Sequence, residues 1–229
     1  MAKPVTTTPA RITAWSFSRW RDYEECPFKA KCKYVLKLKE PDNQYTARGS
    51  QIHKEAEDYA GGALKKLPAS LASFKDEFAK LRKLSPQLEQ QWAFTRSWQP
   101  TGWFDSNAWL RIKLDVNVMV KGRRYVIDHK TGKQREEHED QLGLYALGAF
   151  LMHPMDDDLE VQDWYLDKKP DDPTKIVGAD FTRDQLDDLK AEWERKTKIM
   201  LLDAKFTPKP NDKCRFCHYR KNNGGPCKF

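Results

Sequence analysis

Eight residues in the middle of the chain, from Arg111 to Val118, alternate polar and apolar side chains without a fault. A period of two is that of a strand with one buried face. Gly122 follows as a turn, and the stretch from Arg124 to Lys130 then predicts the second strand of a hairpin. The chain therefore has to build a sheet around this hairpin.

The rest of the chain changes between helical and strand periods. Residues 15–38 have helical spacing, interrupted at Cys26-Pro27 because proline disfavours helix at the residue before it. We expect a single α/β domain over residues 15–229, in which helices flank a central mixed β-sheet, after a flexible N-terminus of residues 1–14. The other expected helices cover residues 49–60, 68–84, 136–150 and the stretch after Thr182, and the other expected strands cover 88–98, 160–167 and 175–180.

Charge is unevenly distributed along the 229 residues, whose net charge is +7. The first 40 residues hold nine Lys/Arg against four Asp/Glu, and residues 205–229 hold seven against one, so the middle carries a net −4. Basic ends around an acidic centre fit a nucleic-acid-binding rim around a cation site, although a basic pI is also common in proteins that bind neither.

Targeting and membrane signals are missing from the sequence. No run approaches the roughly 18 apolar residues that a membrane span needs, and the first residues lack the apolar core of a secretory signal. We therefore expect a cytoplasmic protein of a bacterial, archaeal or phage-infected cell, with no membrane partner. No G-x-x-x-x-G-K-[ST] motif is present, so no nucleoside triphosphate partner is expected.

The predicted hairpin carries a set of residues suited to phosphodiester hydrolysis. If the two strands pair, Asp115, Asp128 and Lys130 converge on one patch. Two carboxylates supply the oxygen ligands that Mg²⁺ requires, and a lysine can orient water or stabilise developing charge. An Asp-x-Lys on a strand is also what a surface salt bridge looks like, so the triplet alone does not decide between the two.

Three further residues extend this pattern. His53 ends a Gly-Ser-Gln-Ile-His run on a predicted helix, and Gln141 and Tyr145 stand four residues apart on one face of the helix after the hairpin. Each of these features is common in ordinary helices. Their order along the chain, G-S-x-x-H, then a strand Asp, then D-H-K, then Q-x-x-x-Y, resembles that of the RecB-type nucleases of the PD-(D/E)XK superfamily.

This resemblance implies a restriction-endonuclease-like core and a role for each residue. His53, Asp115 and Asp128 would bind the catalytic Mg²⁺ or Mn²⁺, with the backbone carbonyl of His129 as a further ligand. Lys130 would be the catalytic lysine, and Gln141 and Tyr145 would position the DNA strand. The implied activity is metal-dependent exonucleolytic hydrolysis of DNA, on single strands or frayed ends.

Three cysteines near the end of the chain indicate a second metal site. Cys214 and Cys217 form a C-x2-C pair, and Cys227 follows after nine intervening residues. Thiolates at this spacing can hold a metal, whereas a disulfide does not suit a reducing compartment. A fourth ligand is missing, and the residues available for it are Cys26, Cys32 and His218.

The run from Ser16 to Pro27 is similar to the S-x-S-x-x-x-x-Y-x-x-C-P element of the iron–sulfur members of the family, the AddB-type and Cas-four-type exonucleases. This resemblance implies a structural [4Fe–4S] cluster on Cys26, Cys214, Cys217 and Cys227, which would join residues 15–40 to residues 205–229. The gap before Cys227 is longer than is usual in these relatives. Zn²⁺ on the same four cysteines is the alternative.

Two other functions stay open at this point. One is a catalytically silent protein of the same fold that binds nucleic acid or a protein partner, and the other is a zinc-clasped endonuclease. If the protein is a nuclease of either kind, we expect it to bind DNA that is single-stranded or has free ends. We also expect a partner protein of recombination, repair or CRISPR adaptation. Aromatic residues between positions 92 and 109 could stack unpaired bases, although core packing is their commoner use.

Overall fold

The computed structural model of the protein describes residues 11–41, 44–134 and 137–229. Its contacts divide the chain into two compact units, each described here by itself. The first joins the two ends of the chain, Met1–Asp42 and Glu192–Phe229, and the second is Asn43–Ala191. The sequence had led us to expect a single domain over residues 15–229. Both segments expected to be joined by the cysteines, 15–40 and 205–229, fall within the first unit.

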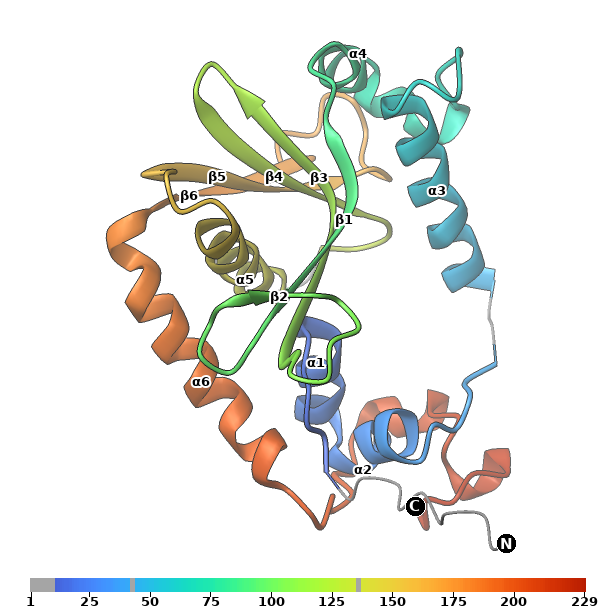
Figure 1. The fold of residues 1–229 in the computed structure, drawn as a ribbon. Coiled ribbons are helices and arrows are strands. Elements are labelled where there is room, and N and C mark those ends of the chain that lie inside the picture. Colours follow the sequence, from blue (N-terminus) through green and yellow to red (C-terminus); the bar gives the residue numbers. More distant parts are fainter. Residues whose placement is uncertain (1–10, 42–43, 135–136) are drawn as a thin grey trace, which may run out of the picture. The chain divides into compact units, whose positions relative to one another are not determined.

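A six-stranded sheet forms the centre of the second unit (Figure 1). Strands β4 and β5 pair in parallel and all other neighbours pair antiparallel, so the predicted mixed sheet is confirmed. The sheet order is β2-β1-β3-β4-β5-β6, and the strands are β1 (Gln87–Phe94), β2 (Pro100–Thr101), β3 (Leu110–Val120), β4 (Arg123–Lys130), β5 (Asp158–Tyr165) and β6 (Ile176–Thr182).

The predicted hairpin is the pair β3–β4. Its register places Val116 opposite Ile127 and Val118 opposite Tyr125. Gly122 makes the turn with φ at +86°, a left-handed conformation that glycine adopts at little cost. The alternation seen in the sequence therefore corresponds to an actual half-buried strand pair, and β2 is the one described strand that the sequence did not predict.

Helices of the second unit lie against this sheet. Helix α3 (Gln44–Ala60) begins earlier than predicted and ends, as predicted, at Gly61-Gly62. A 3₁₀ turn (Ala69–Phe74) leads into α4 (Lys75–Lys83), and α5 (Glu137–Met152) follows β4. After β6, a 3₁₀ turn (Arg183–Gln185) opens α6 (Leu186–Leu202), whose later part belongs to the first unit.

Side chains of β4 and β5 alternate between two different environments. Ile127 and Trp164 belong to an apolar cluster with Phe74 and Phe78, which also buries the inner face of α3. Asp128, the next residue along β4 after Ile127, is directed to the other side of the sheet. There Tyr145 of α5 donates a hydrogen bond to its carboxylate. Strand β4 therefore packs against α3 and α4 through its apolar side chains and contacts α5 through Asp128.

The first unit contains the predicted break at Cys26-Pro27. Helix α1 (Phe17–Glu25) ends there and α2 (Pro27–Ala30) begins, followed by a π-helical stretch (Lys31–Val35). Trp193 of α6 is buried and stacks on Trp15 at 5.3 Å between ring centroids. The tail holds two short 3₁₀ turns, Asp212–Phe216 and Lys221–Asn223, and no strand element within its described residues.

Two expectations about the ends of the chain can be compared with this unit. Residues 1–10 of the expected flexible N-terminus lie outside the described residues, but Ile12 and Ala14 are buried. Burial of these two side chains means that the ordered structure begins before Trp15. Among the described helices, none combines the length and the apolar character that crossing a membrane requires.

Candidate active site

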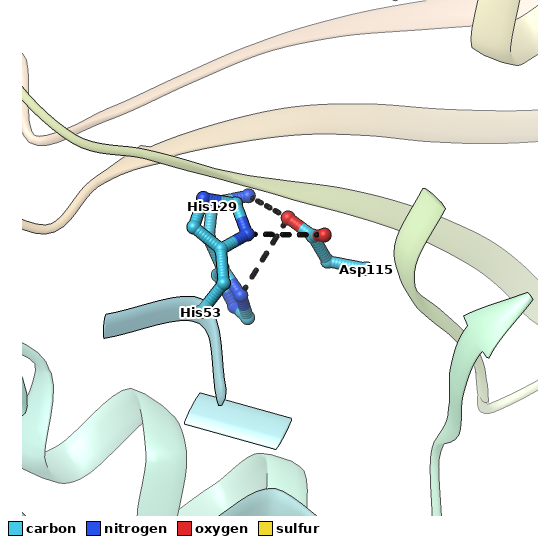
Figure 2. Close-up of side chains that lie close together, drawn as sticks. All are labelled: His53, Asp115 and His129. Atoms are coloured by element: carbon cyan, nitrogen blue, oxygen red, sulfur yellow. Dashed lines mark hydrogen bonds and ion pairs between the residues drawn. The ribbon is translucent and has the colours of Figure 1, made fainter. Parts of the chain in front are cut away.

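Three side chains from different elements meet beside the hairpin (Figure 2). His53 comes from α3, Asp115 from β3 and His129 from β4. His53 Nδ1 lies 3.3 Å from Asp115 Oδ1, and the backbone N–H of His129 donates to Asp115 Oδ2 at 2.6 Å. One ligand atom from each of the three lies within 4.8 Å of the others, so the group can hold a cation.

Packing of α3 explains why His53 reaches this position. Its chain neighbour Ile52 and the nearby Ala56 are buried in the apolar cluster with Val116 and Ile127. Since these contacts hold α3 against the hairpin, His53 is carried to the end of the paired region, next to Asp115. The predicted helical position of His53 and the predicted strand position of Asp115 are both confirmed.

The three side chains shift one another's pKa values. Burial alone would raise the pKa of Asp115, but its hydrogen bond with His53 and the field of His129 outweigh burial and lower the pKa to about 2. Burial would lower the pKa of His53, but the contact with Asp115 outweighs it and raises that pKa. Burial lowers the pKa of His129, although the Asp115 carboxylate acts in the opposite direction.

The imidazole of His129 fits a metal ligand. Its Nδ1 lies 3.7 Å from Asp115 Oδ2, too far for a hydrogen bond, and its Nε2 is buried without a hydrogen-bond partner among the described residues. Whichever nitrogen carries the proton, the ring faces a carboxylate without sharing a proton with it. A cation between the two would supply the missing positive charge, so these residues fit a divalent metal.

Four other predicted residues form a second, adjoining group. Lys130 Nζ lies 2.7 Å from Asp128 Oδ2 and donates to the side-chain oxygen of Gln141. Tyr145 donates to the other Asp128 oxygen and accepts from Gln141 Nε2 at 2.8 Å. Burial and the Asp128 charge raise the pKa of Tyr145 well above its usual value, so the phenol stays a hydrogen-bond donor.

Asp128 therefore stands between the two groups. Its carboxylate is engaged by Lys130 and Tyr145 and is not one of the three converging ligands. The negative charge of Asp128 favours the protonated form of both His53 and His129, against the effect of burial. An interaction of this kind requires that the carboxylate lie close to the His53–Asp115–His129 group. The predicted roles of Asp128 and of the His129 carbonyl as metal ligands stay predictions.

The sequence analysis did not identify a buried carboxylate close to the Lys130 ammonium group. Asp163 of β5 is 1% exposed, and one of its oxygens lies 3.6 Å from Lys130 Nζ. Its other oxygen accepts a long hydrogen bond from Tyr165, whose hydroxyl lies 2.7 Å from His138 Nδ1. Burial raises the pKa of Asp163 to about 7. Asp163 stands on the same strand face as Val161 and Tyr165, whereas Glu160 stands on the other face, and this position was the available signal.

The imidazole of His129 was also missed. The sequence analysis assigned a metal contact to its backbone carbonyl, whereas the structure brings its side chain into the group with His53 and Asp115. A neighbouring carboxylate across the hairpin was the signal that could have indicated this.

Cys26, Cys214, Cys217 and Cys227 line one cavity of the first unit, together with Lys29. Backbone N–H groups donate to two of the sulfurs, from Lys209 to Cys26 Sγ at 3.4 Å and from Asn211 to Cys214 Sγ at 3.3 Å. None of the five cysteines, all of which the structure describes, forms a disulfide. Four thiols around one space, with amides directed at the sulfurs, fit a metal centre.

The other two residues considered for the fourth ligand are placed differently. Cys32 is fully buried, and burial raises its pKa to about 11, so this thiol stays protonated. His218 is exposed and does not line the cavity. Of the three residues considered, the cavity therefore contains Cys26 alone.

Comparison with known proteins identifies the family. The model of the PD-(D/E)XK nuclease superfamily matches residues 14–115 and 110–221, and no curated protein matches the chain. The solved structure of a candidate exonuclease from Eubacterium rectale has a TM-score of 0.55 at 14% identity, over 96% of this chain and 93% of its own. The structure of SSO0001 has a TM-score of 0.45 at 13% identity, over 96% of this chain and 88% of its own.

The family match covers most of the chain and includes His53, Asp115, Asp128 and Lys130. The mixed sheet, with Asp115, Asp128 and Lys130 on its central hairpin and His53 on α3, agrees with that match, and the Eubacterium rectale structure shows the same fold. This chain belongs to the PD-(D/E)XK nuclease superfamily.

Proposed function

We propose that the protein is a metal-dependent DNA exonuclease that hydrolyses phosphodiester bonds of single-stranded or frayed DNA. The observation that carries the proposal is the pairing of a cation-binding group, His53–Asp115–His129, with a lysine–carboxylate group on one hairpin. A protein that only binds nucleic acid has no need of a half-buried lysine held between Asp128 and Gln141.

Each residue has a distinct role in this proposal. His53 and Asp115 would hold Mg²⁺ or Mn²⁺, with Asp128 and the His129 carbonyl as further ligands, and this metal would supply the positive charge that polarises the phosphate and a water molecule. Lys130 orients the attacking water and stabilises the charge that develops on the phosphate.

Gln141 and Tyr145 connect the lysine–carboxylate group to helix α5. The Tyr145 hydroxyl, whose one proton is donated to Asp128, also lies 3.2 Å from the carbonyl oxygen of Lys113 on β3, so one phenol contacts both β3 and β4. Gln141 contacts both Lys130 and Tyr145. We infer that the two residues keep the lysine aligned and position the DNA strand beside it.

The cysteine cavity holds a structural [4Fe–4S] cluster in this proposal, on Cys26, Cys214, Cys217 and Cys227. Tetrahedral Zn²⁺ needs sulfurs about 4 Å apart. Within the part of the chain that the structure describes, the one set of three or more ligand atoms within 4.8 Å is the histidine–aspartate group, and no cysteine belongs to it. A cubane holds its thiolates farther apart, because irons and sulfides lie between them, which favours the cluster over Zn²⁺.

A preference for DNA ends is the finer part of the proposal. The similar Eubacterium rectale protein carries the name of a candidate exonuclease. The chain has no nucleotide-binding P-loop motif to drive unwinding. A nuclease of this kind would begin at ends that are already single-stranded or frayed.

Cleavage of linear single-stranded DNA, labelled at one end, tests this function. In Mn²⁺ or Mg²⁺ the wild-type protein should release the label or shorten the labelled strand, and in EDTA it should leave the strand intact. Labelling each end in turn gives the direction of digestion. Asp128→Asn keeps the size of the side chain and its contact with Tyr145, so it serves as the matched inactive variant. A covalently closed circle is the substrate that an exonuclease should leave uncut.

Two results would redirect the proposal. Cutting of the circle at the rate of the linear strand would make the protein an endonuclease. No cleavage of any DNA by the folded, metal-replete protein would favour the silent binding protein instead.

A further inference from the structure

The donor set of the cation-binding group is unusual for Mg²⁺. It consists of two imidazoles and one carboxylate, from His53, His129 and Asp115. Figure 2 shows both rings directed at the same carboxylate, each from its own element. Mg²⁺ favours six oxygen ligands in a near-ideal octahedron, whereas imidazole suits transition metals such as Fe²⁺, Ni²⁺ and Zn²⁺; Mn²⁺, at the weak end of that series, is the transition metal most like Mg²⁺.

His129 is held in a ligand-ready position by its surroundings. Its ring packs against Phe78 at 5.4 Å and Trp164 at 5.9 Å between centroids, within the apolar cluster. Its backbone N–H is fixed by Asp115, which limits rotation of the residue as a whole. The ring is therefore pre-positioned, so little conformational entropy is lost when a metal binds.

The nitrogens of this ring lack the hydrogen bonds that buried polar atoms usually make. Its Nε2 is buried without a hydrogen-bond partner among the described residues, and its Nδ1 faces Asp115 Oδ2 at 3.7 Å. A buried polar atom without a partner costs free energy, and such atoms are rare in folded proteins. A metal bound between Nδ1 and the Asp115 carboxylate would give the Nδ1 lone pair a partner, and the ring proton would then be on Nε2.

We infer that the His129 imidazole is itself a metal ligand, and that the site consequently selects Mn²⁺ or another transition metal over Mg²⁺. This inference rests on the proposed metal-dependent function, but it concerns which metal binds and through which atoms. The competing interpretation is a histidine that serves as core packing between Phe78 and Trp164, with no part in binding the cation.

His129→Phe separates these interpretations, because it keeps a ring in the aromatic pocket and removes both nitrogens. Calorimetric titration of the full chain with Mn²⁺ should show affinity at least about 10-fold weaker in the variant, while Mg²⁺ affinity changes little. His153→Phe is the matched control, since His153 contacts Trp92 and Asn117 and lies outside the group. Unchanged Mn²⁺ affinity in a folded His129→Phe protein overturns the inference.

A spectroscopic count of ligands keeps the test independent of that variant's folding. Electron spin echo modulation of Mn²⁺ bound to wild-type protein should show two histidine nitrogens, and His53→Phe should leave one. A single histidine nitrogen in the wild-type spectrum contradicts the inference. Neither measurement involves DNA, so a protein that binds Mn²⁺ through two imidazoles but cuts no DNA would disprove the proposed function and keep this inference.

Discussion

The two candidate metal sites are built in opposite ways. The sheet site takes Asp115, Asp128 and Lys130 from one hairpin, whose register fixes where each side chain lies. The cysteine cavity is not built on paired strands. Around it, hydrogen bonds join segments far apart in sequence, from Lys209 to Cys26 and from Asn211 to Glu25, over separations of 183 and 186 residues. The first site is thus positioned by regular structure, and the second brings together distant segments.

Because of this difference, we expect the sheet site to contribute mainly to catalysis and the cysteine site mainly to folding stability. Where secondary structure already holds the ligands, removing a metal should affect chemistry more than folding. Where short 3₁₀ turns and loops hold the ligands, the metal itself supplies much of the folding free energy. The two sites should therefore respond to substitution in different measurements, and the following substitutions test that separation.

The largest effect is expected on catalysis. Asp128→Asn should lower the cleavage rate by about 10³-fold or more, a barrier increase of about 4 kcal/mol, because it removes the carboxylate that pairs with Lys130. The melting temperature should stay within a few degrees, since Asn retains an oxygen for Tyr145. A cleavage assay and a thermal melt on the same preparation measure both, and a variant that still cuts at the wild-type rate rejects this site.

The largest effect on stability is expected at the cysteines. Cys214→Ser should destabilise the protein by about 3 kcal/mol and abolish absorption near 400 nm, because a ligand that joins distant segments is lost. Cys32→Ala is the matched control, since Cys32 is buried but stays protonated, and it should keep the absorption. Iron analysis with denaturant unfolding checks both, and full metal loading in Cys214→Ser would remove this residue from the site.

Asp163 gives the sheet site a measurable pH dependence. Its pKa is raised to about 7 in the folded protein, so the folded state holds a proton that the unfolded chain has lost. Its contribution therefore weakens the fold as pH rises from about 4 to about 7, at about 1.4 kcal/mol per pH unit. Asp163→Asn should remove this slope. Denaturant unfolding at pH 5 and pH 7.5 measures it, and identical slopes in both proteins would disprove the assignment.

A smaller effect is expected from the glycine next to the cysteine cavity. A Cβ on Gly225 would lie 2.2 Å from the backbone carbon of Tyr219, so Gly225→Ala should cost about 2 kcal/mol and speed loss of the cavity's metal on heating. Gly122→Ala at the hairpin turn meets nothing within 4 Å and should cost about 1 kcal/mol, from its positive φ alone. Thermal melts followed at 400 nm compare the two, and equal rates of metal loss would argue against a close approach at Gly225.

The sequence predicted the parts of the site that depend on local periodicity. Alternation from Arg111 to Val118 gave the strand that carries Asp115, and helical spacing gave the positions of His53 and Tyr145. These predictions hold because one buried face imposes a period on the nearby residues.

The residues that the sequence did not reveal depend on contacts between distant elements. The His129 imidazole gains its role from Asp115 on the neighbouring strand and His53 on α3. Asp163 acquires its raised pKa from burial beside Lys130, on a strand that follows a whole helix later. Neither local spacing nor composition carries that information, and the division of the chain into two units has the same origin.

One measurement tests the central claim that the sheet site cuts DNA while the cysteine site maintains the fold. Cleavage of end-labelled single-stranded DNA in Mn²⁺ and the melting temperature are recorded for the wild type, Asp128→Asn and Cys214→Ser, with cleavage assayed well below each melting temperature. We expect Asp128→Asn to lose cleavage and keep its melting temperature, and Cys214→Ser to melt at a lower temperature and still cut. The reverse pattern, with cleavage retained in Asp128→Asn and lost in a still-folded Cys214→Ser, would contradict it.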